Sequence, residues 1–262
     1  MAMHDERDLF ATGDYSFWSR IFEPSSEALI DAARVLTGDR VLDVASGNGN
    51  TALAAARRGA NVTALDLSPA QIERGRSRSL MDGKPLTWVE GDAGLLPFRD
   101  GSFDCAFNSF GDVIVLEEML RVVQPGGVVG ITEWTGESFV GAMTELYEGL
   151  GLYASLEPGA GAARSGPRWG QEDYVRARLA PHTDHIDIRR QVITARFESV
   201  KRLCDELAQK DPYVHEIHEQ LSSEQLEGLS EGLRRLVAGW NRADDDGLLL
   251  DLSYLLTVAH KP

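Results

Sequence analysis

The sequence has few of the features that would stabilise or anchor a protein by special means. Its two cysteines, Cys105 and Cys204, are too few for a disulfide framework, which indicates a reducing compartment. No apolar run approaches the ~18 residues needed to span a bilayer, and residues 1–10 lack the apolar stretch of a secretion signal. We therefore expect a cytoplasmic protein with no membrane partner.

Positive charge is also scarce: the sequence has 26 Lys and Arg residues and 41 Asp and Glu residues, which gives a formal net charge of −15. Such a surface repels phosphate backbones, so we expect no nucleic-acid partner. The densest basic stretch is interpreted as solvated helix faces; it comprises Arg57, Arg58, Arg74, Arg76 and Arg78. The length of 262 residues fits one large α/β domain or one domain with a cap, as a monomer or homodimer.

Strand and helix signals alternate along the first half of the chain. Short β-branched runs predict strands, and segments of strong helix formers between them predict helices. Ser68 and Pro69 are typical of an N-cap followed by the first helical residue. The expected strands are 40–45, 61–67, 86–90, 102–109 and 128–134, and the expected helices are 51–58, 70–79 and 115–123.

This alternation predicts a parallel sheet with right-handed crossovers. Two further β-like runs, 184–197 and 248–259, would complete it. The fold class expected is α/β: a Rossmann-like three-layer sandwich with a mostly parallel seven-stranded sheet and a helical cap. Ligands of such sheets bind beyond the carboxyl ends of the strands.

The turn after the first strand contains two glycines that would let a ligand approach the backbone. Gly47 and Gly49, with Ala52, satisfy G-x-G-x-x-A, the nicotinamide fingerprint. Asp66 ends the second strand 17 residues after Gly49, where a carboxylate can accept ribose hydroxyls of either cofactor. Asp43 precedes Gly47 by four residues, and a carboxylate there suits an ammonium group better than a pyrophosphate.

Further motifs follow in a fixed order. They are Gly-Asp-Ala at 91–93, Leu-Pro-Phe at 96–98, Asp-Gly-Ser-Phe-Asp at 100–104 and Pro-Gly-Gly at 125–127. Together with the glycine turn, this set resembles the class I S-adenosylmethionine-dependent methyltransferases, in the branch like the quinone-biosynthesis methyltransferases. The resemblance covers residues 13–135 well and the remainder loosely.

The resemblance implies which residues hold the methionine part of the cofactor. Gly47 and Gly49 would face it, and Asn108, at the end of the fourth strand, would line the same side. Asp43 would orient the glycine loop and help bind the ammonium group. The alternative is that Asp43 forms a local turn and that Asn108 caps the strand end.

The resemblance also implies a nucleoside side of the site. Asp66 would bind the ribose hydroxyls, with Leu67 beside it. Asp92 would accept a hydrogen bond from the adenine amino group, with Ala93 next to the ring. The alternative for Asp92 is an Asx turn after Gly91.

An aromatic stripe near the N-terminus allows two interpretations. Tyr15, Trp18 and Phe22 share one face of a predicted helix. In relatives this segment resembles a lid over the cofactor, so that aromatic faces would attract the sulfonium cation. The stripe could equally dock the helix onto the core.

Histidines are the candidate bases, although methyl transfer requires one only if the acceptor must lose a proton. His182, His185 and His215 are weak candidates. The pair His215 and His218 is spaced i, i+3 and fails the H-E-x-x-H zinc motif. We expect no metal.

The predicted organisation has three parts. Residues 1–136 form the cofactor-binding half with a lid helix, 137–180 form a cap insertion, and 181–262 supply the remaining strands and helices over the acceptor site. The segment after Asn108 is shorter than in relatives, and it helps to shape the acceptor side.

The predicted function is S-adenosylmethionine-dependent O- or C-methylation of a small molecule by in-line displacement. The first alternative is a protein of this fold that binds the cofactor without methylating, because fold does not fix function. A less favoured alternative is an NAD(P)-dependent oxidoreductase, which leaves the later motifs unexplained.

Overall fold

The computed structural model describes residues 16–111, 115–150, 170–183, 185–210 and 221–262. Its elements are α2 (Ser16–Ala32), β1 (Arg40–Val44), α3 (Asn50–Arg57), β2 (Asn61–Asp66), α4 (Pro69–Met81), β3 (Thr87–Glu90), η1 (Ala93–Leu95), β4 (Phe103–Ser109), α5 (Leu116–Val122), β5 (Val123–Trp134), α6 (Phe139–Gly149), α7 (Glu172–Leu179), β6 (Ile186–Phe197), α8 (Val200–Lys210), α10 (Ser223–Trp240) and β7 (Leu248–His260).

The seven strands form one sheet in the order β3-β2-β1-β4-β5-β7-β6. Strands β1 to β5 pair in parallel, whereas β7 runs antiparallel to both β5 and β6. This confirms the predicted Rossmann-like, mostly parallel sheet. The fifth strand begins at Val123, five residues before the predicted start, because the Pro-Gly-Gly turn lies inside it.

Local sequence signals explain why the central elements form. In β1 all residues after Arg40 are buried, as expected for a strand covered on both faces. Ser68 caps α4 by accepting a hydrogen bond from the backbone N–H of Gln71, and Pro69 occupies the first turn, as predicted. Small side chains on α3 let it pack closely on the sheet, and Ala52, Ala54 and Ala55 are fully buried there.

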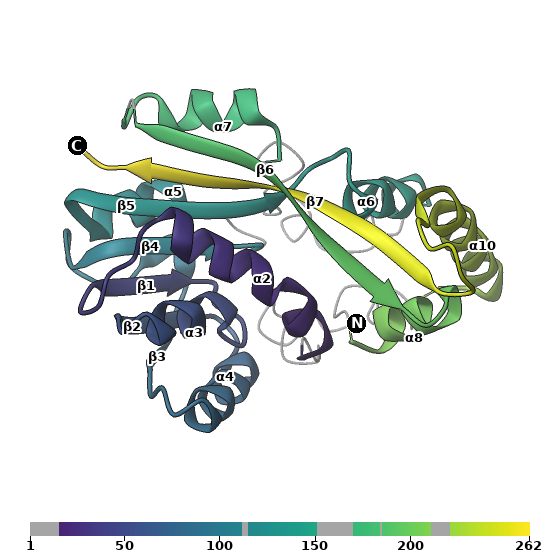
Figure 1. Ribbon diagram of the computed structural model, residues 1–262, viewed down its shortest axis with the longest axis horizontal. Helices are drawn as coiled ribbons and strands as arrows, with labels where there is room; N and C mark the ends of the chain where they lie inside the picture. Colours follow the sequence, from purple (N-terminus) through teal and green to yellow (C-terminus); the bar gives the residue numbers. More distant parts are fainter. Residues whose placement is uncertain (1–15, 112–114, 151–169, 184, 211–220) are drawn as a thin grey trace.

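The last two strands extend beyond the rest of the sheet. Pairing between β5 and β7 covers residues 128–134 and 254–260, but β6 and β7 remain paired as far as Phe197 and Leu248. Figure 1 shows α6, α8 and α10 grouped around this end of the β6–β7 ribbon. Buried leucines of α8 and α10, with Phe139 and Tyr147 of α6, belong to the same core cluster as Leu29 and Ile30 of α2. These helices are the observed helical cap.

Candidate active site

Four of the predicted cofactor residues come from one edge of the sheet. Strand β1 pairs in parallel with β2 and β4, and β2 pairs in parallel with β3, so their carboxyl ends share that edge. Asp43 lies near the end of β1, Asp66 ends β2, and Asn108 lies near the end of β4. Asp92 follows β3 by two residues. The topology therefore brings these four residues to one edge of the sheet, and their roles in cofactor binding stay predictions.

Asp66 organises the loop between β1 and α3. One of its carboxylate oxygens accepts from the backbone N–H of Gly47 at 2.7 Å, and the other accepts from that of Ser68 at 2.9 Å. Hydrogen bonds between a charged acceptor and backbone donors are shorter and stronger than neutral ones. The carboxylate thus joins the glycine loop to the start of α4.

The two glycines of the loop are required for different reasons. Both have positive φ, +52° at Gly47 and +87° at Gly49, which side chains disfavour. A Cβ on Gly47 would meet no atom of the described residues within 4 Å, so among them the backbone here borders open space. A Cβ on Gly49 would lie 2.6 Å from the indole of Trp88, so Gly49 is needed for packing. Only Gly47 leaves room for a ligand.

Asp43 contacts the helix that follows the glycine loop. Its side chain is 2% exposed, and it accepts a hydrogen bond at 2.8 Å from the backbone N–H of Ala52 in the first turn of α3. Burial raises its pKa to about 7; the bond from Ala52 opposes this rise, and the nearby charge of Asp66 adds to it. The bond fixes the first turn of α3 relative to β1, and the roles of Asp43 in orienting the glycine loop and in binding the ammonium group stay predictions.

Asp92 lies at the solvent-exposed end of the same edge. Its carboxylate accepts from the backbone N–H of Gly94 at 2.7 Å, which begins the short helix η1. This is the local turn that the sequence offered as an alternative. The turn holds Asp92 and Ala93 beside the end of β3, while Leu67 follows Asp66 in the neighbouring connection.

Asn108 is fully buried and ties two strands together. Its amide nitrogen donates to the carbonyl oxygen of Val44 at 3.1 Å, which links β4 to the end of β1. A Cβ on Gly111 would lie 2.7 Å from that amide nitrogen. The chain after β4 therefore passes close over Asn108 at Gly111.

Four aromatic rings pack beside Asn108 and are called here the aromatic cluster: Phe22, Phe110, Trp134 and Tyr254. Phe110 stacks on Trp134, with ring centroids 3.9 Å apart and planes at 10°. Phe22 and Tyr254 close the cluster at centroid distances of 5.6 and 5.5 Å from Phe110. Burial raises the pKa of Tyr254 to about 12. Phe110 follows β4 and Trp134 ends β5, so two of these rings lie at the carboxyl ends of strands that neighbour β1 in the sheet.

Phe110 adopts an uncommon backbone conformation within this cluster. Its φ is +52°, in a region that bulky residues avoid, and its N–H donates to the carbonyl oxygen of Thr132 at 3.0 Å. Outliers of this kind persist only where the surroundings over-determine them, and they gather at functional sites. Phe110 and Tyr254 belong to no sequence motif, so nothing in the sequence singles them out as site residues.

The aromatic stripe of α2 packs into the interior. Trp18 stacks on Phe22 at 5.6 Å and meets the edge of Phe197 at 6.2 Å, and both Trp18 and Phe22 join the main apolar core. These contacts favour the docking interpretation of the stripe. Tyr15 lies outside the described residues, as does His215.

His182 and His185 lie at the opposite end of the sheet. The backbone carbonyl of His185 accepts from the N–H of His260, which pairs with Val128 near the start of β5. The carboxyl end of β5 at Trp134 is six residues away, about 20 Å along a strand. Both side chains are exposed. This location argues against the catalytic role predicted for them.

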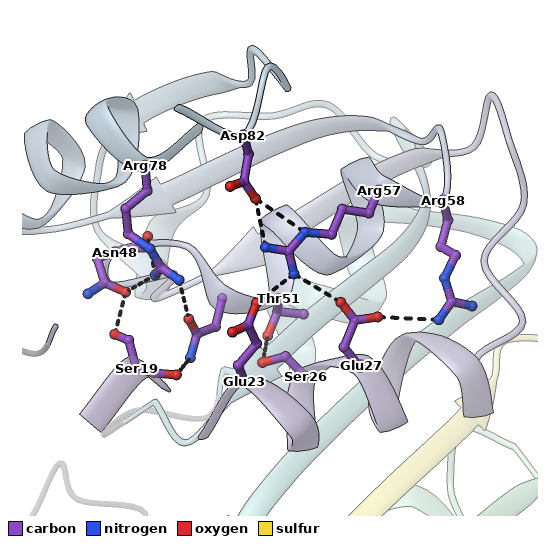
Figure 2. A network of polar contacts seen from close by, with 11 residues as sticks. Ser19, Glu23, Ser26, Glu27, Asn48, Thr51, Arg57, Arg58, Arg78 and Asp82 are labelled. Atoms are coloured by element: carbon purple, nitrogen blue, oxygen red, sulfur yellow. Dashed lines mark hydrogen bonds and ion pairs between the residues drawn. The ribbon is translucent and has the colours of Figure 1, made fainter. Parts of the chain in front are cut away.

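Three of the arginines interpreted as solvated helix faces make contacts with other elements: Arg57 and Arg58 pair with α2, and Arg78 contacts the glycine loop. Arg57 bonds Glu23 of α2 at 2.6 Å and Asp82 beyond α4 at 2.6 Å. Arg58 pairs with Glu27 of α2, and Arg78 of α4 reaches the glycine loop (Figure 2). Arg57 and Arg58 remain on solvated helix faces, where they pair with carboxylates of α2, whereas Arg78 is half-buried and departs from that interpretation.

Two kinds of structure are absent from the part of the chain that is described. No group of three or more His, Cys, Asp or Glu side chains is arranged to hold a metal ion. No helix there is both long and apolar enough to cross a bilayer.

Comparison with protein families matches a methyltransferase domain over residues 41–127, the segment that contains the glycine loop. A demethylmenaquinone methyltransferase of Beutenbergia cavernae is 33% identical over 187 residues, which cover 69% of this chain and 72% of that protein. An uncharacterized protein of Mycobacterium tuberculosis is 35% identical over 195 residues, covering 72% of this chain and 69% of that protein.

Solved structures share the fold. A methyltransferase candidate from Bacillus halodurans superposes with a TM-score of 0.60 at 17% identity, covering 91% of this chain and 99% of that one. A phosphoethanolamine N-methyltransferase of Haemonchus contortus, in complex with S-adenosylhomocysteine, gives 0.60 at 19% identity, covering 99% of this chain and 61% of that one.

The fold and the relatives define an S-adenosylmethionine-dependent methyltransferase. The chain belongs to class I of these enzymes, in the branch that includes the demethylmenaquinone methyltransferases.

Proposed function

We propose that this enzyme transfers the methyl group of S-adenosylmethionine to oxygen or carbon of a small, flat, apolar acceptor. The observation that carries the proposal is the cradle at Gly47, where open space borders a backbone segment held by Asp66. The aromatic cluster beside Asn108 supports the acceptor class. The demethylmenaquinone methyltransferases among the relatives support a small molecule as the acceptor.

The chain's own residues suit the parts of the proposed cofactor. Gly47 and Asn108 would border the methionine portion, and the carboxylate of Asp66 would accept the ribose hydroxyls, with Leu67 beside it. Asp92 and Ala93, on the exposed rim, would hold the adenine. When bound, the cofactor supplies a methyl group already activated by a sulfonium, so the protein's task is alignment and exclusion of water.

The acceptor would lie against the aromatic cluster. Rings of Phe110 and Trp134 offer a flat apolar surface, and such surfaces favour stacked or edge-on aromatic partners. The same rings exclude water from the line of attack. Tyr254 has its pKa raised to about 12, so it stays protonated and would serve as a hydrogen-bond donor and not as a base.

Adding S-adenosylmethionine is expected to raise the melting temperature. At 100 times Kd a ligand adds about 2.7 kcal/mol of stability, which corresponds to about 5–10 °C for a domain of this size. S-adenosylhomocysteine should act similarly, whereas NAD and NADP should not. A shift with a nicotinamide cofactor alone would overturn the proposal. Cofactor binding with no methylated product across a broad acceptor panel would favour the non-methylating alternative.

Replacing Gly47 by Ala tests the cradle separately from stability, with Gly83→Ala as the matched control. Both glycines have positive φ, +52° and +64°, and a Cβ at either meets nothing within 4 Å. Each variant should therefore lose about 1–2 kcal/mol of stability for the strained backbone. Only Gly47→Ala should weaken S-adenosylmethionine binding, by about tenfold or more, in titration calorimetry. Equal affinities in the two variants would contradict the placement of the cofactor.

A further inference from the structure

A group of hydrogen-bonded polar side chains joins three helices at the middle of the glycine loop (Figure 2). Its members are Ser19 of α2, Asn48 of the glycine loop, Asn50 at the start of α3, and Arg78 of α4. The hydroxyl of Ser19 donates to the side-chain oxygen of Asn48 at 2.7 Å, and the amide of Asn50 donates to the carbonyl oxygen of Ser19 at 2.9 Å. We call these four residues the loop node.

Arg78 provides most of the contacts within the loop node. Its guanidinium donates to the backbone carbonyl oxygen of Asn48 at 3.0 Å, to the side-chain oxygen of Asn48 at 2.6 Å and to that of Asn50 at 2.9 Å. The planar fork of arginine matches several acceptors at once, which lysine does not. Asn48 lies between the two glycines, so Arg78 fixes the peptide that borders the cradle.

The location of Arg78 is unusual for a cation. The side chain is half-buried, and burial lowers the pKa of its guanidinium, although Glu23 and Asp82 oppose that shift from longer range. The hydrogen bonds above go to amide and carbonyl oxygens and not to carboxylates. By contrast Arg57, on the neighbouring helix, bonds carboxylates at both ends of its fork. Arg57 holds helices together, whereas Arg78 holds the loop.

Helix α2 contributes one residue to the loop node, Ser19, and one to the aromatic cluster, Phe22, which lies three positions later. Ser19 contacts the glycine loop, while Trp18 stacks on Phe22 of the aromatic cluster. The loop that would hold the methionine part and the rings that would face the acceptor are therefore fixed to the same helix. A shift of α2 would displace both.

We propose that Arg78 and Ser19 are positioning residues for the methyl transfer: they hold Asn48, and with it the loop, in the shape that binds the cofactor. This inference rests on the proposed function. Neither residue touches the reacting atoms. Both act through Asn48, and this shared route predicts that their effects on cofactor affinity are not additive.

The experiment is calorimetric titration of the full chain with S-adenosylmethionine, at a temperature well below unfolding. The variants are Ser19→Ala, Arg78→Gln, Arg78→Lys and the double variant Ser19→Ala/Arg78→Gln. Two controls match them: Arg76→Gln is an exposed arginine on the same helix, and Ser26→Ala removes a buried α2 hydroxyl that contacts Thr51 of α3, outside the loop.

Arg78→Gln should weaken binding by at least about tenfold, since hydrogen bonds to a charged group are lost. Arg78→Lys should recover part of that loss, because the charge remains without the fork. Ser19→Ala should weaken binding by a smaller factor, and the double variant by less than the product of the two. Arg76→Gln should bind as the wild type does, and Ser26→Ala should lower the melting temperature with no change in affinity.

Three outcomes would overturn the inference. Arg78→Gln and Ser19→Ala could both bind within twofold of the wild type, even with lowered melting temperatures, which would make the loop node purely structural. The loss of affinity in the double variant could equal the product of the two single losses, which would show that Arg78 and Ser19 do not act through Asn48 together. Ser26→Ala could weaken binding as much as Ser19→Ala does, which would assign the effect to α2 docking in general.

The design separates failure of this inference from failure of the proposed function. A wild-type protein that binds neither S-adenosylmethionine nor S-adenosylhomocysteine would contradict both the proposed function and this inference. A wild-type protein that binds, beside variants that bind equally well, ends only the inference. If Arg78→Gln does not fold, the comparison of Ser19→Ala and Arg78→Lys with Ser26→Ala still decides it.

Discussion

Replacing Asp66 by Ala is expected to abolish cofactor binding at ordinary concentrations. The substitution removes the acceptor for the N–H groups of Gly47 and Ser68 and the proposed acceptor for the ribose hydroxyls. Each hydrogen bond to a charged group contributes about 1.5–3 kcal/mol, so loss of the ribose pair alone weakens binding by about 100-fold or more. Titration calorimetry with S-adenosylmethionine measures this directly.

Two companion variants make the Asp66 result interpretable. Asp66→Asn keeps one acceptor oxygen and the side-chain size, so its affinity should lie between those of the wild type and Asp66→Ala. Asp187→Ala removes an exposed carboxylate from β6, the edge strand at the far end of the sheet from β2 and β3. This variant should leave binding unchanged. Wild-type affinity in Asp66→Ala would remove the central contact of the proposed site.

Replacing Asp43 by Asn is expected to make stability less dependent on pH. Burial raises the pKa of Asp43 to about 7 from the ordinary aspartate value of 3.8. Between these two pH values the folded protein holds a proton at Asp43 that the unfolded chain has released, so stability falls as pH rises through this window. Each pH unit is worth about 1.4 kcal/mol, so the loss at this group between pH 5 and pH 8 is about 3 kcal/mol. Asparagine does not ionise, so the Asp43→Asn variant does not lose this stability as the pH rises.

Urea unfolding at pH 5 and at pH 8 measures the difference between the wild type and Asp43→Asn. Other carboxyl groups, such as Asp104, have lowered pKa values and give a slope of the opposite sign at more acidic pH. They are common to both proteins, so the comparison isolates Asp43. Curves that stay parallel from pH 5 to pH 8 would show that Asp43 is already ionised at pH 5 in the folded protein.

The sheet could be predicted from the sequence because its strands are short and separated by clear turn signals. Residues 40–45 and 61–67 are β-branched runs, each followed by turn residues, and the structure places β1 and β2 there. The start of β5 was misplaced because Pro-Gly-Gly normally ends an element. Here Gly126 takes φ +77°, and Gly127 packs so closely on the carbonyl oxygen of Asp104 that a Cβ would lie 2.5 Å away.

The placement of Asp43, Asp66 and Asn108 at one edge of the sheet was predictable for the same reason, since strand ends are visible in the sequence and a parallel sheet brings them together. The aromatic cluster was not. Phe22, Phe110, Trp134 and Tyr254 come from four elements spread over more than two hundred residues, and packing alone unites them. Arg78 was misassigned because its partners lie in a loop thirty residues earlier.

The strand order also dictates when the sheet can be completed during synthesis. Strand β7 lies between β5 and β6, so β6 leaves the ribosome before the strand it pairs with. About fifty residues separate Phe197 from Leu248, a delay of roughly 3–10 s at about 5–20 residues per second. Through that interval β6 is a nascent strand without its neighbour. Its Arg189, Arg190 and Arg196 are the kind of charged side chains that discourage strands of separate molecules from pairing.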